Sequence, residues 1–84
     1  MGELSNLPNI GKELERQLSE VGIHTEIDLK QVGSMQAWLK IKGIDESACI
    51  NRLYALEGAI QGMNKKDLAI EKKEELKAFY KSFR

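Results

Sequence analysis

Apolar residues recur along this chain at the spacing of α-helices, and strand-like alternation is absent from it. Leu14, Leu18 and Val21 stand at positions i, i+4 and i+7, which predicts a first helix with one apolar stripe. We expect this helix to begin after Gly11 and to end at Gly22, where a glycine adopts a left-handed conformation at little cost. Its stripe is expected to face the core of the protein.

Hydroxyl side chains and glycines mark the ends of two further helices. Thr25 is expected to cap the second helix, with Asp28 completing a capping box, and Gly33 is expected to end it. Ser34 is then expected to cap a third helix that Gly43 ends. The buried positions are drawn from Ile27, Leu29 or Val32 in the second helix and from Met35, Trp38, Leu39 and Ile41 in the third.

The fourth helix has the widest apolar stripe in the sequence. Asp45 is predicted to cap it, with Glu46 in its first turn, where the helix dipole favours acidic side chains, and Gly62 is predicted to end it. Gly58 costs about 1 kcal/mol relative to alanine inside a helix, so we interpret it as the site of a close crossing by another helix. The stripe comprises Cys49, Leu53, Leu56 and Ile60, widened by Ala48, Ala55 and Ala59.

A fifth helix follows Asp67 and Leu68 and has an apolar side and a basic side. The apolar side consists of Leu76, Phe79, Tyr80 and Phe83, and the basic side consists of Lys73, Lys77, Lys81 and Arg84. The basic side is either an ordinary solvated face or a contact for nucleic acid or an acidic protein, and we favour the solvated face.

Together these patterns predict a compact all-α domain of five helices that occupies residues 1–84 as a single unit. The hydrophobic fraction of 42% is sufficient for a globular core, and the single proline and the prevalence of Leu, Ile, Glu and Lys are typical of helical proteins. The chain contains no low-complexity tract and no linker that would divide it.

Residues 7–12 read Leu-Pro-Asn-Ile-Gly-Lys and are the most specific motif of the chain. A tight turn here would place Ile10 in the core and leave Gly11 to open the first helix, as in the hairpin of helix-hairpin-helix, SAM-like domains. Residues 41–45 repeat this pattern 34 positions later, with Asp45 where the first copy has Gly11. The sequence leaves open whether this second segment is a degenerate second hairpin.

Asn9, Gly11 and Lys12 are the candidate contact residues of the hairpin. Backbone N–H groups at a helix start, with a lysine beside them, are suited to bind a phosphate group. The alternative is a structural turn that only joins helices. Affinity for DNA increases with the number of phosphates neutralised, and Glu13 and Glu15 follow directly after the single lysine. We therefore favour the structural turn.

Charge is balanced over the whole chain but is divided along it. The formal net charge is zero, so no overall field attracts the protein to nucleic acid or to an anionic membrane. Residues 1–33 carry six acidic and three basic side chains, a net charge of −3, whereas residues 64–84 carry seven basic and four acidic ones, a net charge of +3. The hairpin segment is therefore acidic and the last helix basic.

No group of residues has the composition or spacing of a catalytic or metal site. His24 has no second histidine or cysteine at ligand spacing, and Cys49 lies at core spacing without an activating base. Glu57 is either a buried functional carboxylate or a structural group that accepts a loop N–H, and we favour the structural role. We expect no enzymatic activity, no cofactor, no metal and no small-molecule substrate.

Several of these segments together resemble the TfoX C-terminal domain family. The resemblance runs from about Leu7 to Leu76, and the family includes bacterial regulators of natural competence, in which this domain often follows a separate N-terminal domain. It implies a helical domain in a bacterial regulatory setting. The matching segments are Leu-Pro-Asn-Ile-Gly-Lys at 7–12, Val-Gly-Ile-His-Thr at 21–25 with Asp28-Leu29, Val-Gly-Ser at 32–34, Asn-Arg-Leu-Tyr-Ala-Leu-Glu-Gly-Ala-Ile at 51–60, and Asp67-Leu68.

We therefore expect a non-enzymatic interaction module that acts by contact with a protein partner. The alternative is weak, sequence-nonspecific DNA binding through the hairpin turn and the basic last helix. The single cysteine, the absence of an apolar run of transmembrane length and the absence of a signal-peptide pattern favour a cytoplasmic protein without a membrane partner.

Overall fold

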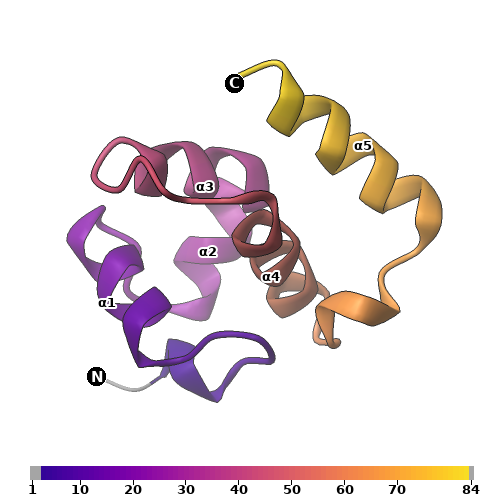
Figure 1. Cartoon of the computed structure of the whole chain (residues 1–84). Coiled ribbons are helices and arrows are strands. Elements are labelled where there is room, and N and C mark those ends of the chain that lie inside the picture. The colour runs from indigo at the N-terminus through magenta and orange to yellow at the C-terminus, as the bar shows by residue number, and fades with distance from the viewer. Residues whose placement is uncertain (1–2, 84) are drawn as a thin grey trace.

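The computed structural model describes residues 3–83, and every regular element in that range is helical (Figure 1). The prediction of an all-α fold with five helices is confirmed for this part of the chain. Two short 3-10 helices accompany the α-helices. In chain order the elements are η1 (Leu4–Asn6), α1 (Lys12–Glu20), α2 (Glu26–Val32), α3 (Ser34–Lys42), α4 (Ile50–Gln61), η2 (Lys65–Asp67) and α5 (Ile70–Lys81).

The helix α4 is the centre around which the other elements are arranged (Figure 1). It contacts α2, α3, η2 and α5, while α1 packs against η1 and α3. Leu53 and Leu56 are fully buried, as the apolar stripe of this helix predicts. Ile10 of the hairpin segment is also buried in the same core. The hairpin and α4 therefore share one hydrophobic cluster.

Aromatic side chains attach α5 to the rest of the molecule. Trp38 of α3 is fully buried, and its ring lies 5.5 Å from that of Tyr80 and 6.2 Å from that of Phe79, in edge-on contact. Leu76 is fully buried beside them, whereas Phe83 is 46% exposed. The predicted apolar side of the fifth helix is thus confirmed for its first three residues.

Several helix ends lie where local sequence signals predict them. The side chain of Thr25 accepts the backbone N–H of Asp28 at 3.1 Å and caps α2. Gly62 ends α4 in the left-handed conformation, with a φ of 76°. These ends depend on interactions within about one helical turn, which is why the sequence reveals them.

The predicted cap of the third helix is wrong. Ser34 is the first residue of α3, Gly33 is its N-cap, and no side-chain hydrogen bond caps the helix. The hydroxyl of Ser34 instead donates a hydrogen bond of 2.6 Å to the carboxylate of Glu57 on α4. The hydroxyl that the local pattern assigned to the helix end therefore binds a side chain 23 residues away in the sequence.

The predicted cap of the fourth helix is also wrong, because Asp45 caps a turn and not the helix. One of its carboxylate oxygens accepts the N–H of Ser47 at 3.0 Å. The helix α4 begins only at Ile50, with the exposed Cys49 as its N-cap. The expected core position of Cys49 is therefore incorrect, and residues 41–45 do not lead into a helix in the way that the first hairpin segment does.

The close approach predicted at Gly58 is present, but its partner is not a crossing α-helix. A Cβ atom built on Gly58 would lie 2.5 Å from Asn9 Nδ2, 2.8 Å from the carbonyl oxygen of Met63 and 3.2 Å from Lys65 Cα. The neighbours are the hairpin side chain and the segment that turns back into η2. The glycine leaves room for both of them.

Candidate interaction surfaces

Hydrogen bonds of the Asn9 side chain connect the hairpin segment, residues 7–12, to the end of α4 and the segment that follows it. Its amide nitrogen donates to the carbonyl oxygens of Met63 at 3.0 Å and Ala55 at 3.4 Å, and its amide oxygen accepts the N–H of Lys65 at 3.1 Å. Asn9 has a φ of 70°, a left-handed conformation that asparagine adopts more readily than most residues. Both polar ends of this candidate residue are thus used inside the protein.

The other two candidate hairpin residues, Gly11 and Lys12, are exposed at the start of α1. Gly11 is the N-cap and supplies no side-chain hydrogen bond. The first turn contains Glu13 and Glu15, which complement the positive end of the helix dipole. A hydrogen bond and ion pair from Arg16 lower the pKa of Glu13. Negative charge therefore already occupies the helix end at which a phosphate would bind.

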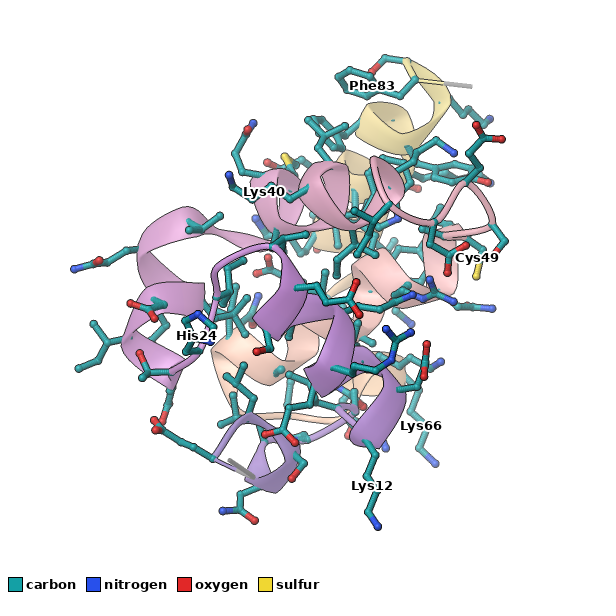
Figure 2. All side chains as sticks on the ribbon, turned by 90° about the vertical axis from the view of Figure 1, so that its left-hand side faces the viewer. Lys12, His24, Lys40, Cys49, Lys66 and Phe83 are labelled. Carbon is teal, nitrogen blue, oxygen red and sulfur yellow. The ribbon has the colours of Figure 1, made fainter. Side chains whose placement is uncertain are left out.

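The Asn9 contacts bring lysines of η2 next to the hairpin. Lys65 donates its backbone N–H to Asn9, and Lys66 is the exposed residue that follows it. The ammonium group of Lys73 donates to the carbonyl oxygen of Lys66 at 3.2 Å, which connects the start of α5 to η2. Figure 2 shows Lys12 and Lys66 on the same side of the molecule. The hairpin and the basic C-terminal segment, separate in the sequence, therefore meet through η2.

The predicted basic side of α5 is not a single uniform surface. Lys73 is half-buried and bound to η2, whereas Lys77 and Lys81 are exposed farther along the helix. Arg84, the fourth predicted member, lies outside the described residues. Of the three members that the structure describes, only Lys73 is joined by a hydrogen bond to the elements around the hairpin.

Glu57 lies half-buried where α4 passes the start of α3. Its carboxylate accepts hydrogen bonds from Ser34 at 2.6 Å and from Gln61 at 2.5 Å. Lys72 and Glu75 line the same pocket of about 330 Å³, and the hydrogen bond that Lys72 donates to Glu75 raises the pKa of the lysine. The partners are a hydroxyl and a side-chain amide instead of the expected loop N–H, and the Ser34 contact ties α3 to α4.

A polar network that the sequence analysis missed joins α1 to α4. Gln17, only 3% exposed, donates to the Asp45 carboxylate at 2.8 Å and accepts from Arg52 at 3.2 Å, while Arg52 pairs with Asp45 at 3.0 Å. Hydrogen bonds from Ser47, Gln17 and Arg52 hold the pKa of Asp45 well below its usual range. The only hint in the sequence is the polar Gln17 beside the apolar stripe of the first helix.

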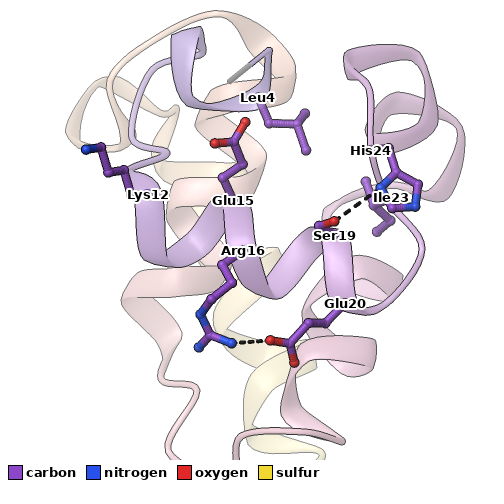
Figure 3. Close-up of a pocket in the computed structure, with 8 residues that line it drawn as sticks. All are labelled: Leu4, Lys12, Glu15, Arg16, Ser19, Glu20, Ile23 and His24. Atoms are coloured by element: carbon purple, nitrogen blue, oxygen red, sulfur yellow. Dashed lines mark hydrogen bonds and ion pairs between the residues drawn. The ribbon is translucent and has the colours of Figure 1, made fainter. Parts of the chain in front are cut away.

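A groove of about 460 Å³ crosses α1 between η1 and the joint that leads to α2 (Figure 3). Leu4 and Ile23 lie beneath it but are only 1% exposed, so the apolar part of its surface comes mostly from carbon atoms of the other lining side chains. No periodic pattern marks this groove, so the sequence analysis did not find it. The remaining lining residues are Lys12, Glu15, Arg16, Ser19, Glu20 and His24.

Two kinds of feature are absent from the range that the structure describes. Residues 3–83 contain no group of three or more His, Cys, Asp or Glu side chains that could hold a metal ion. No helix in that range is long and apolar enough to cross a membrane. His24, the one histidine, lies 3.3 Å from the hydroxyl of Ser19 through its Nδ1 atom.

Comparison with known proteins identifies relatives that match most of this chain. The model of the family described as the TfoX C-terminal domain matches residues 1–80. Protein Sxy of Escherichia coli (strain K12) is 34% identical over 73 residues, which are 87% of this chain and 35% of that protein. The chain thus spans about a third of the length of this curated relative.

Two crystal structures of Listeria monocytogenes proteins have the same fold. An uncharacterized protein in a triclinic form is 52% identical, with a TM-score of 0.94 over 95% of this chain and 91% of that one. A protein of unknown function in a tetragonal form is 51% identical, with a TM-score of 0.92 over 95% of this chain and 99% of that one.

Proposed function

This chain belongs to the TfoX C-terminal domain family, and from that membership we propose that it is a competence-regulator-like regulatory protein of bacteria. We assign its action to non-catalytic contact with another protein. The relationship to Protein Sxy supports the regulatory role, and it concerns one helical module, because the matched segment is about 35% of that protein.

The groove across α1 is the observation that carries this proposal. Its exposed surface combines carbon atoms with polar and charged groups, a mixture that is usual in protein–protein contacts. Most of its lining residues, among them Lys12, Ser19 and His24, are exposed to solvent, whereas sites for small ligands enclose most of the ligand surface. These features favour a segment of another protein as the bound partner.

A photo-crosslinking experiment in bacterial cells tests the proposal. A photoreactive amino acid is introduced at the exposed Ser19 of the groove and, as a control, at the exposed Lys77 of α5. We expect Ser19 to yield a discrete crosslinked protein species that Lys77 does not yield. Thermal unfolding of both variants checks that each is folded. A folded Ser19 variant without any protein adduct contradicts protein contact through the groove.

As a second candidate we propose weak, sequence-nonspecific DNA binding, favoured by the lysines that meet at the hairpin. Lys12, Lys65 and Lys66 are brought to one region through Asn9, and additional cations increase affinity for the phosphate backbone. Glu13 lies at the same helix start and opposes a phosphate there. We therefore rank this function below protein contact.

Fluorescence anisotropy of labelled duplex DNA at low and moderate salt tests the second candidate. We expect a dissociation constant within about 10⁻⁴–10⁻⁶ M, with strong salt dependence. Lys12→Glu and Lys66→Glu are expected to weaken binding more than the matched control Lys77→Glu. Sub-micromolar binding at moderate salt would reverse the ranking of the two functions. A loss confined to Lys77→Glu and Lys81→Glu would place the contact on α5.

A further inference from the structure

We propose that the groove across α1 binds a basic, amphipathic segment of a partner protein. Apolar side chains of that segment would pack on the exposed carbon surface of the groove, and its lysines or arginines would pair with carboxylates around it. This inference rests on the proposed function, because it specifies the chemistry of the partner that the same module contacts.

The acidic side chains near the groove fall into two groups. Glu13 and Glu20 both pair with Arg16, and Glu26 pairs with Lys30 at 3.0 Å. These three carboxylates share two cations, each on the same helix as its partners. Each of them already has a cation within ion-pair distance, so a partner would gain less from approaching it than from approaching an unpaired carboxylate.

The second group consists of Glu3, Glu15 and Asp28, which form no ion pair with any described residue. Their carboxylates accept backbone N–H groups instead. The donors are Glu26 for Glu3, Ser5 for Glu15 and His24 for Asp28, each at 3.2 Å. Such bonds hold the carboxylates in place while leaving their charge available to a partner.

All three of these carboxylates stand beside the groove. Glu15 lines it, Asp28 accepts the backbone N–H of His24 on the rim, and Glu3, next to Leu4 in the chain, accepts the N–H of Glu26 at the start of α2. In Figure 3 the side chain of Glu15 projects from α1 toward Leu4, and Ile23 lies to the right, near Ser19 and His24. The groove therefore lies beside negative charges that hydrogen bonds hold in position.

One cation on the rim sets the orientation expected of the partner. Lys12 also lines the groove, and Figure 3 places it on the opposite side of the view from Ile23 and His24. We expect the basic side chains of the partner to lie toward His24 and its polar or acidic end toward Lys12. Charge complementarity of this type gives specificity and speeds association.

A designed peptide is the direct probe of this site. It is a fluorescein-labelled amphipathic peptide of leucine and lysine, about 14 residues and thus about four helical turns long. One control replaces its lysines with glutamate, and the other replaces its leucines with serine. We expect both controls to bind the protein at least about tenfold more weakly in anisotropy titrations.

Chemical-shift mapping of the unmodified protein locates the bound peptide. We expect the largest amide shifts at Leu4, Ser19, Ile23 and His24, and small shifts along α5. This measurement needs no variant and therefore does not depend on whether a substituted protein folds. Shifts confined to α5, or equal binding of the glutamate peptide, would overturn the assignment of a basic partner to this groove.

A neutralised variant tests the role of the fixed carboxylates. Amide side chains keep the hydrogen-bond acceptors and remove the charges, and a control variant has the same change in net charge away from the groove. We expect the groove variant to bind the leucine–lysine peptide about tenfold more weakly and the control to differ by less than about twofold. The groove variant is E3Q/E15Q/D28N, and the control is E46Q/E71Q/E74Q.

The two proposals fail in different ways. A protein adduct from Ser19 combined with failure of the leucine–lysine peptide leaves protein contact standing and overturns only the basic chemistry of the partner. If the groove variant and the control variant bind the leucine–lysine peptide equally weakly, the local role of the groove carboxylates is also overturned. Absence of any adduct from a folded Ser19 variant overturns the proposed function itself.

Discussion

The amide nitrogen of Asn9 occupies the space that a side chain on Gly58 would need. A Cβ atom at Gly58 would lie 2.5 Å from Asn9 Nδ2, and the same nitrogen donates to Met63 O and Ala55 O. The asparagine of the hairpin and the glycine of α4 therefore form one structural unit. This unit holds the hairpin, the end of α4 and η2 together.

Substitution of Asn9 tests the importance of this unit. Asn9→Ala removes the hydrogen bonds to Met63 O and from Lys65 N and places alanine at a φ of 70°. We expect a loss of about 1–3 kcal/mol in the free energy of unfolding, measured by urea denaturation. Asn9→Gly removes the same bonds without the backbone strain, so it should be the less destabilised variant. An Asn9→Ala protein as stable as the natural chain would contradict this.

Gly58→Ala should destabilise the protein even though alanine is the better helix former. The helix-propensity gain of up to about 1 kcal/mol is opposed by the clash of the new Cβ with Asn9 and with the backbone of Met63 and Lys65. We expect a net loss of about 1–3 kcal/mol in thermal or urea unfolding. Gly11→Ser is the control, because nothing lies within 4 Å of a Cβ at Gly11 and serine is a good N-cap. A stabilised Gly58→Ala variant would disprove the close approach.

Truncation of the buried leucines of α4 should strongly destabilise the protein. Leu53→Ala and Leu56→Ala each remove a fully buried side chain and leave a cavity. We expect each to cost about 2–5 kcal/mol in the free energy of unfolding. Ile70→Ala is the control, since Ile70 is 71% exposed and its truncation should change stability by less than about 0.5 kcal/mol. Similar midpoints for all variants would show that α4 is not central.

The hydrogen bonds of Asp45 imply that the folded protein loses stability in acid. Hydrogen bonds from Ser47, Gln17 and Arg52 hold its pKa below its ordinary value of 3.8 in the folded protein. A carboxylate whose pKa is lower in the folded state stabilises the fold above the unfolded pKa, and this contribution is lost as the pH falls below it.

We therefore expect the urea midpoint to fall as the pH decreases below about 4, and to fall less steeply in Asp45→Asn. Glu46→Gln on the same loop is the control and should retain the slope of the natural protein. The Asp45→Asn protein should also be less stable near neutral pH, because the charged partner of Arg52 is lost. Identical slopes for Asp45→Asn and the natural chain would contradict this role.

The sequence by itself determined the helical class and several helix ends. The stripe of Leu53 and Leu56, the capping interaction of Thr25 and the left-handed Gly62 are all present in the structure. Periodicity and capping depend on residues within one or two helical turns, so they can be identified in a single sequence. The predicted burial of Ile10 has the same origin, because a tight turn must direct its apolar residue inward.

Tertiary structure alone decided the partners of the polar side chains and therefore the form of the candidate surfaces. Ser34 donates to Glu57, 23 residues away, and Asn9 donates to Met63, 54 residues away. These partners replaced the local capping role expected of Ser34 and directed the predicted contact residue Asn9 into the protein. The groove over Leu4 likewise exists only because η1 and the start of α2 meet beside α1. Contacts between distant segments have no periodic signature, so their geometry is set only when the core brings the helices together.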